Sequence, residues 1–198
     1  MSNAAHLAQP PSATGSLSDF PAFNLTPSLR VFRIHAKDYG PWWFSTSMKS
    51  RFDLADPDGT CYVAESRLGA FVERFQDFSV IPFSVIRDSK IASLQLPQPL
   101  RLADCTAPQA RRFGMTGEIH TVAARDITQA WAQAFSRDGF DGMRYFARHD
   151  PSMKRKSIAI FGAAGEVNWP VVHDRRIDKR LIQRAKEVFG IKVLDTLS

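Results

Sequence analysis

The sequence predicts an α+β fold, with sheets that are mostly antiparallel and helices at their flanks. Short runs rich in β-branched and aromatic residues indicate strands, and three longer runs with apolar residues at helical spacing indicate helices. With 198 residues, the chain is long enough to bury about 70% of its unfolded surface in a core. It contains no internal repeat and no apolar run of the roughly 20 residues that a membrane span requires.

The N-terminal residues are rich in Ser, Ala and Pro, with few large apolar side chains before Phe20. Such a segment buries too little to offset its ordering entropy, so we expect residues 1–28 to form a flexible arm. Residues 29–198 are then expected to form a single domain. It begins with a strand at 29–36, LRVFRIHA, in which Arg33 falls on the more polar face.

A central stretch, from Trp42 to Phe75, follows a break in the chain at residues 38–41. Asp56-Pro-Asp-Gly is a strong turn signal and predicts a short strand at 60–64. From Glu65 the periodicity becomes helical, because one apolar stripe is formed by Leu68, Phe71, Val72 and Phe75.

After residue 75 the sequence predicts further strands and helices. The expected elements, in order, are β-structure between 78 and 101, a loop with one helical turn at 104–120, a helix capped by Asp126 and carrying Trp131 and Phe135, strands at 143–148 and 157–161, a helix at 175–189 ended by Gly190, and a last strand of IKVL.

Composition limits the classes of function. Cys61 and Cys105 lie far apart and belong to no CxxC motif, so we expect buried thiols rather than a disulfide framework or a zinc site. The chain starts without a secretory signal, which predicts a cytoplasmic protein. The net charge of +6 favours an anionic ligand or an acidic partner. Direct nucleic-acid binding is not expected, although the basic face of the C-terminal helix could engage a partner.

Three polar residues of the central stretch, Arg51, Tyr62 and Glu73, are spaced by eleven and eleven. This spacing predicts an arginine in a loop, a tyrosine on a strand and a glutamate on a helix, all facing one cleft. Arginine suits phosphate, the tyrosine ring suits a planar heterocycle, and a carboxylate suits a sugar hydroxyl. Each residue also has an ordinary structural interpretation: a solvated arginine, a half-buried strand tyrosine and a solvated helix-face glutamate.

The chain also resembles the RES domain family, named for characteristic Arg, Glu and Ser residues. The matching segments are RVFRIH at 30–35, FSTSMKSRFDL at 44–54, TCYVAES at 60–66 with the helix to Glu73, DGFDGMRYFARHD at 138–150 and SIAIFG at 157–162. The resemblance implies an ADP-ribosyltransferase-like fold and a toxin of a bacterial toxin–antitoxin module, with an antitoxin as protein partner. It also implies a site that consumes NAD as substrate without a metal, by hydrolysis, by phosphorolysis or by transfer of ADP-ribose. The oligomeric state stays open, a homodimer included.

The resemblance also implies roles for individual residues. Arg33 and Arg51 would hold the pyrophosphate, Tyr62 would pack on nicotinamide, and Glu73 would act on the ribose. The characteristic serine is expected in the ligand site at the position of Ala147, whose side chain makes no hydrogen bond. Ser45, Ser152 or Ser157 could supply the missing hydroxyl; if none does, the chain would be a catalytically impaired module that binds NAD or a partner.

Overall fold

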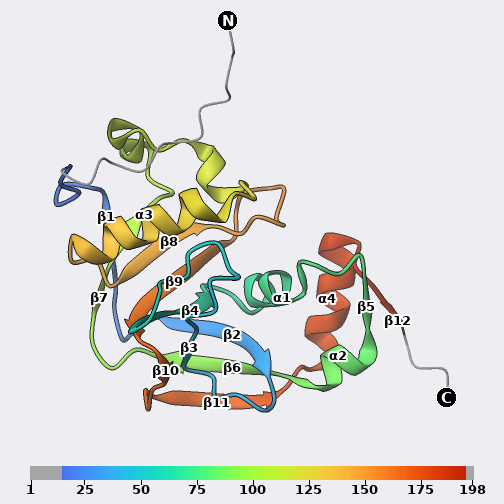
Figure 1. Ribbon diagram of the computed structural model, residues 1–198. Coiled ribbons are helices and arrows are strands. Elements are labelled where there is room, and N and C mark those ends of the chain that lie inside the picture. Colours follow the sequence, from blue (N-terminus) through green and yellow to red (C-terminus); the bar gives the residue numbers. More distant parts are fainter. Residues whose placement is uncertain (1–14, 195–198) are drawn as a thin grey trace, which may run out of the picture.

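A computed structural model describes residues 15–194, and its main feature is an eight-stranded sheet with the order β1-β7-β8-β9-β4-β2-β6-β11 (Figure 1). The strands are β1 Ala22–Leu25, β2 Arg30–Ala36, β4 Asp58–Ala64, β6 Ser89–Gln95, β7 Leu100–Asp104, β8 Gly142–Phe146, β9 Lys156–Ala163 and β11 Val171–Arg176. Neighbouring strands of this sheet are antiparallel except for the parallel pair β7 and β8. The predicted α+β fold with mostly antiparallel sheets is therefore confirmed.

Two small sheets and several helices complete the fold. The small sheets pair β3 Trp43–Phe44 with β10 Gly165–Glu166, and β5 Val80–Pro82 with β12 Lys192–Leu194. The helices are α1 Arg67–Phe75, α2 Phe83–Arg87, α3 Arg125–Arg137 and α4 Lys179–Phe189, with 3-10 turns η1 Pro108–Phe113 and η2 Gly117–His120. Helix α3 packs along β8, and α1 packs against α4 and β2 (Figure 1). Among residues 15–194, no helix has both the length and the apolar character for crossing a membrane.

The sheet opens between β2 and β4. Along its whole length β4 is paired with β9, but its register with β2 consists of one pair, Phe32 with Ala64. Beyond that pair the two strands diverge, and the Arg33 side chain reaches from β2 toward β4, where its Nη1 lies 2.8 Å from Sγ of Cys61. This divergence creates the space in which the candidate site lies.

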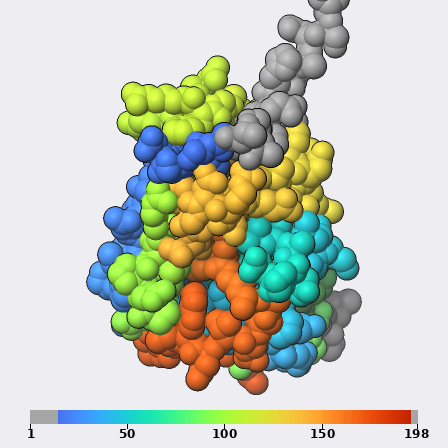
Figure 2. All heavy atoms as spheres, turned by 60° about the vertical axis from the view of Figure 1, so that its left-hand side comes forward, coloured from blue at the N-terminus to red at the C-terminus, as the bar shows by residue number. Residues whose placement is uncertain are grey.

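The N-terminal segment corrects the predicted arm. Residues 1–14 lie outside the described residues, but β1 pairs with β7, and Leu17 and Phe20 are buried in the cluster that includes Trp131 and Phe135 of α3. In the space-filling view the blue N-terminal segment lies beside the yellow-green segment near residue 110 (Figure 2). Burial of these apolar side chains offsets the ordering entropy, so the boundary expected at residue 28 falls inside the packed structure.

Helix boundaries supply further corrections. Residues 83–87 form α2, where the sequence predicted only β-structure. The helix expected from residue 175 starts at Lys179, because the side chain of Asp178 accepts from the N–H of Leu181 and caps it. Asp126 lies in the first turn of α3 rather than at its N-cap. In the first turn its negative charge still interacts favourably with the positive end of the helix dipole. Gly190 ends α4 in the left-handed conformation, as predicted.

Both cysteines are buried and unpaired, as expected. Strand β8 ends at Phe146, two residues earlier than predicted. Ala147 and Arg148 therefore belong to the loop that connects β8 to β9. This change matters for the site, because Ala147 is the position where the family resemblance calls for a serine.

Candidate active site

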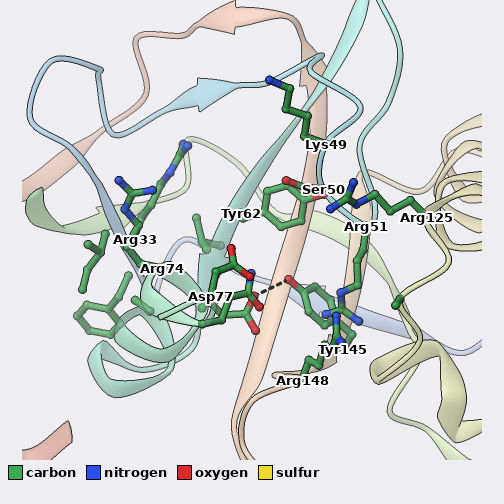
Figure 3. Close-up of a pocket in the computed structure, with 17 residues that line it drawn as sticks. Arg33, Lys49, Ser50, Arg51, Tyr62, Arg74, Asp77, Arg125, Tyr145 and Arg148 are labelled. Atoms are coloured by element: carbon green, nitrogen blue, oxygen red, sulfur yellow. Dashed lines mark hydrogen bonds between the residues drawn. The ribbon is translucent and has the colours of Figure 1, made fainter. Parts of the chain in front are cut away.

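A cavity of about 390 Å³ lies where β2 and β4 diverge (Figure 3). Four of the five residues predicted for the site line it: Arg33 on β2, Arg51 in a loop, Tyr62 on β4 and Glu73 on α1. The loop, strand and helix positions expected for Arg51, Tyr62 and Glu73 are those observed. Ala147 does not line the cavity.

Glu73 presents its carboxylate to the cavity. The Tyr145 hydroxyl donates to its Oε2 at 3.3 Å, whereas Oε1 is shielded from solvent and has no hydrogen-bond partner within residues 15–194. Burial raises the pKa of Glu73, and this rise is opposed by the positive charge of Arg51 and by the hydroxyls of Tyr145 and Ser157. One carboxylate oxygen is thus held by Tyr145, and the other has no hydrogen-bond partner among residues 15–194.

Arg51 lies beside this carboxylate. Its Nη1 donates to the carbonyl oxygen of His120 at 2.7 Å, at the end of η2, and its guanidinium carbon lies 5.3 Å from the centre of the Tyr145 ring. Burial, with a further effect from Arg51, lowers the pKa of His120 to about 4. His120 is therefore neutral at physiological pH, and its Nδ1 accepts from the N–H of Phe146 at 3.3 Å.

The Tyr62 hydroxyl forms its hydrogen bonds with other groups of the protein. The hydroxyl donates to Oδ1 of Asp53 at 2.8 Å and accepts from the N–H of Phe52 at 2.9 Å. Burial, together with the charge of Asp53, raises the pKa of Tyr62 well above its ordinary value. The ring remains part of the cavity wall, whereas the hydroxyl holds the loop of residues 45–53 that carries Arg51.

That loop, the Arg51 loop (residues 45–53), is braced from two sides. Asp53 is buried and also accepts from the Ser47 hydroxyl and the Ser50 N–H. The Gln129 side chain of α3 donates to the carbonyls of Met48 and Ser50 at 3.1 and 2.9 Å. Met48 has a positive φ of 56°, a conformation that a non-glycine residue keeps when its surroundings hold it. The position of Arg51 is therefore set before any ligand arrives.

The cavity is strongly cationic. Its lining includes two carboxylates, Glu73 and Asp77, and six cations: Arg33, Lys49, Arg51, Arg74, Arg125 and Arg148. None of these six forms an ion pair within residues 15–194. Arginines without carboxylate partners around a concave surface favour a ligand with more than one negative charge.

The three serines considered as substitutes for Ala147 lie in different places. Ser152 donates to Asp150 at 2.6 Å, and Ser45 lines a neighbouring cavity. Ser157, on β9 directly opposite Tyr145 of β8, is buried with no hydrogen-bond partner for its Oγ among the described residues. It lies close enough to lower the pKa of both Glu73 and Tyr145. Ser157 therefore brings a hydroxyl to the carboxylate.

Sequence reasoning missed Tyr145 and Arg74 in this cavity. Tyr145 sits in a strand pattern typical of core residues, and its buried ring does pack against Phe52. Arg74 follows Glu73, so the helical pattern places it off the apolar stripe, where a solvated arginine is expected. Within residues 15–194, no group of three or more His, Cys, Asp or Glu side chains could hold a metal ion.

Comparisons with known proteins agree with this fold. A chain in the crystal structure of the M. tuberculosis MbcT–MbcA toxin–antitoxin complex is similar, with a TM-score of 0.63 and 14% sequence identity over 84% of this chain and 92% of that chain. The search of curated proteins gave no match. The model of the RES domain matches residues 30–179, which contain all the site residues described above. The chain therefore belongs to the RES domain family.

Proposed function

We propose that this protein cleaves the bond between nicotinamide and ribose in NAD. The observation that carries the proposal is the carboxylate of Glu73 in a cavity lined by six cations, none of which forms an ion pair within residues 15–194. NAD carries groups that complement both features. Its pyrophosphate suits the arginines, and its ribose hydroxyl and the positive charge that develops on the ribose suit the carboxylate. Membership of the RES family and its implied use of NAD support the same substrate.

In this mechanism the carboxylate of Glu73 accepts a hydrogen bond from the ribose 2′-hydroxyl. As the C1′–N bond breaks, its electron pair leaves with nicotinamide, and the ribose becomes oxocarbenium-like. A carboxylate beside that positive charge lowers the barrier, and a dry, preorganised site strengthens the effect. Arg51, fixed by His120 and the Arg51 loop, holds the anionic part of the substrate and helps to keep Glu73 ionised.

The acceptor at C1′ defines the reaction class. Water would give ADP-ribose, nicotinamide and a proton; inorganic phosphate would give ADP-ribose 1″-phosphate and nicotinamide; a macromolecular nucleophile would become ADP-ribosylated. All three outcomes use the same residues, so they differ in what approaches the far face of the ribose.

The biological setting we propose is that of a cytoplasmic toxin restrained by an antitoxin. The similar solved structure is that of a toxin–antitoxin complex, which supports a protein partner for this chain. A partner that covers the cationic cavity would prevent NAD from entering.

The experiment that tests the proposal is to incubate the purified protein with NAD, with and without phosphate, and to identify the products by mass spectrometry. Release of nicotinamide by the wild type and its loss in Glu73→Gln would support NAD cleavage. A parallel incubation with labelled NAD and a cell extract detects transfer as a labelled macromolecule. If folded wild-type protein leaves NAD intact under all three conditions, the proposed activity is wrong.

A further inference from the structure

A second cavity, of about 570 Å³, adjoins the cavity of Glu73. The two share part of their lining, Arg33, Ile34 and Arg74. The second cavity is also lined by Tyr39, Trp43 and the hydroxyl residues at 45–47, none of which lines the first. A ligand held by Glu73 can thus continue past the shared arginines into a second chamber.

The wall that the two cavities share carries two arginines. Arg33 and Arg74 lie side by side at one end of the first cavity (Figure 3), and neither forms an ion pair in the described part of the chain. Burial and the nearby charge of Arg33 lower the pKa of Arg74. Two guanidinium groups brought together repel each other, and an anion between them would relieve that repulsion.

The second cavity carries a pair of aromatic rings. The ring centres of Tyr39 and Trp43 are 5.4 Å apart at an angle of 54°, and Tyr39 is 56% exposed. Trp43 is half-buried. An aromatic ring with an accessible face can stack on a planar heterocycle, with a favourable free energy of about 1–3 kcal/mol per base.

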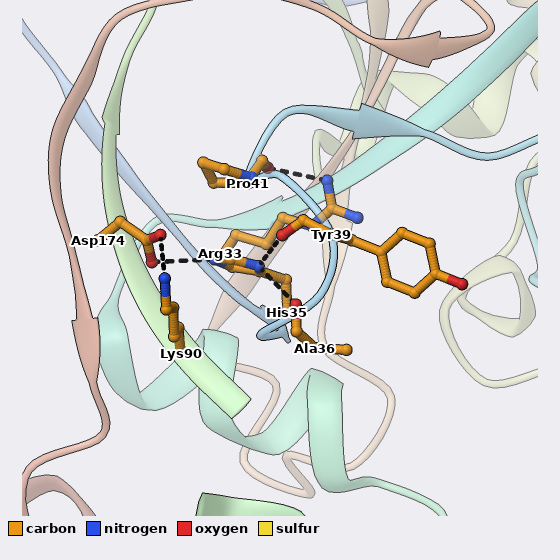
Figure 4. A network of polar contacts seen from close by, with 7 residues as sticks. All are labelled: Arg33, His35, Ala36, Tyr39, Pro41, Lys90 and Asp174. Atoms are coloured by element: carbon orange, nitrogen blue, oxygen red, sulfur yellow. Dashed lines mark hydrogen bonds and ion pairs between the residues drawn. The ribbon is translucent and has the colours of Figure 1, made fainter. Parts of the chain in front are cut away.

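The backbone beneath these rings is held firmly. His35 Nδ1 donates to the carbonyl of Tyr39 at 2.8 Å, and its Nε2 lies 3.1 Å from Asp174, which also binds Lys90 (Figure 4). Arg33 Nη1 donates to the carbonyls of Pro41 and Trp43 at 2.9 and 2.8 Å. The arginine of the anion site therefore also fixes the turn that carries both aromatic rings, so the two features keep a constant relative position.

We propose that the second cavity binds the distal nucleoside of a dinucleotide whose diphosphate crosses between Arg33 and Arg74. The distal base stacks on Trp43 and Tyr39, and the hydroxyls of Ser45 and Thr46 face its ribose. This assignment rests on the proposed function, in which the first cavity holds the nicotinamide half of NAD. It makes the protein selective for dinucleotides over mononucleotides, because a mononucleotide leaves the second cavity empty.

The test compares three ligands on four proteins. NAD fills both cavities, ADP presents a diphosphate and the distal nucleoside, and nicotinamide mononucleotide presents the proximal half. The proteins are the wild type, Trp43→Ala, Tyr39→Ala and a control, Phe78→Ala, which removes an exposed aromatic ring that lines neither cavity. Binding of ADP and of the mononucleotide is measured by calorimetry, and NAD consumption by kcat/KM.

Loss of stacking predicts that Trp43→Ala weakens ADP binding and lowers kcat/KM for NAD by about 5- to 100-fold. Tyr39→Ala acts in the same direction, and because Tyr39 is exposed its removal should not prevent folding. Binding of the mononucleotide changes by less than about twofold in either variant, since it makes no contact with these rings. Phe78→Ala behaves as the wild type.

Two results would overturn the assignment: ADP that does not bind the wild type, or folded Trp43→Ala and Tyr39→Ala proteins that bind ADP as the wild type does. Equal losses for ADP and the mononucleotide would also overturn it, because they would indicate general damage to the site. If ADP binding weakens as expected while NAD is not consumed by any protein, the distal subsite holds and the proposed cleavage fails.

Discussion

The hydroxyl of Tyr145 lies 3.3 Å from Oε2 of Glu73, although the two residues stand 72 positions apart in the chain. Tyr145 comes from β8 and Glu73 from α1, so the contact exists because both elements pack around β9 and β4. Burial raises the pKa of Glu73, and Tyr145 acts against that rise. The ionisation of this carboxylate therefore depends on a residue that lies outside the segment containing Glu73.

Replacing Glu73 by Gln should lower the rate of NAD consumption by about 10²- to 10³-fold, because the developing charge on the ribose loses its negative partner. Nicotinamide release by the purified variant measures this loss. Asp77→Asn is the matched control, since Asp77 is the other carboxylate that lines the cavity, whereas the Tyr145 hydroxyl donates to Glu73. Equal rates for wild type and Glu73→Gln would contradict the assigned role.

The same variant should be more stable than the wild type at neutral pH. The pKa of Glu73 is raised in the folded protein, so ionising it costs folding free energy above that pKa, and glutamine does not ionise. The difference in free energy of unfolding should shrink as pH falls through the raised pKa of Glu73 and should be absent below the ordinary pKa of a glutamate. Thermal unfolding of both proteins across this pH range provides the measurement, and a variant less stable than wild type at pH 7 would count against it.

Ser157→Ala and Tyr145→Phe should each move the acid limb of the activity profile to higher pH. Three groups lower the pKa of Glu73, namely Arg51, Tyr145 and Ser157, and removing one of them lets burial raise that pKa further. In the proposed mechanism Glu73 works as a carboxylate, so activity should be lost as pH falls through its pKa. The profile of kcat/KM for NAD against pH shows the shift, with Ser152→Ala as control. An unchanged acid limb in both variants would show that neither hydroxyl acts on Glu73.

Tyr62→Phe should destabilise the protein by about 1–3 kcal/mol, because it removes the donor to buried Asp53 and leaves the N–H of Phe52 without its acceptor. The free energy of unfolding in urea measures the effect. Because Asp53 and Tyr62 hold the Arg51 loop together, a double-mutant cycle with Asp53→Asn should give a coupling energy clearly different from zero. Strictly additive effects would mean that the two side chains act independently.

Asp150→Asn should destabilise the loop that carries Arg148. Burial opposes ionisation of Asp150, but hydrogen bonds from Ser152 and Arg155 lower its pKa to about 2. A lowered pKa in the folded state gives stability that is present above the ordinary aspartate pKa and is lost as pH falls toward about 2. The difference between wild type and variant in free energy of unfolding should therefore be largest near neutral pH and should decrease between about pH 4 and pH 2. A difference that is independent of pH would exclude this explanation.

Local patterns in the sequence were sufficient for the class of fold and for the elements that carry Arg51, Tyr62 and Glu73. The apolar stripe of Leu68, Phe71, Val72 and Phe75 predicts α1, since helical periodicity depends on residues three and four apart. The turn before β4 is likewise a local signal. Patterns of this kind failed where partners are distant: β1 forms because β7 pairs with it, and β11 replaces the start of the last predicted helix because β6 pairs with it.

For the candidate site, too, the sequence predicted the residues on each element but not the contacts between distant segments. The sequence, with its family resemblance, identified Arg33, Arg51, Tyr62 and Glu73, and all four line one cavity. It could not show that the Tyr62 hydroxyl is bound by Asp53, that Ala147 lies outside the cavity, or that Ser157 and Tyr145 lie against Glu73. Those facts depend on the register of β8 and β9 and on the divergence of β2 from β4. The sequence thus determined which chemical groups are present and on which elements they stand. The tertiary structure alone decided which groups meet, because those contacts are set by strand pairing and packing between segments far apart in the chain.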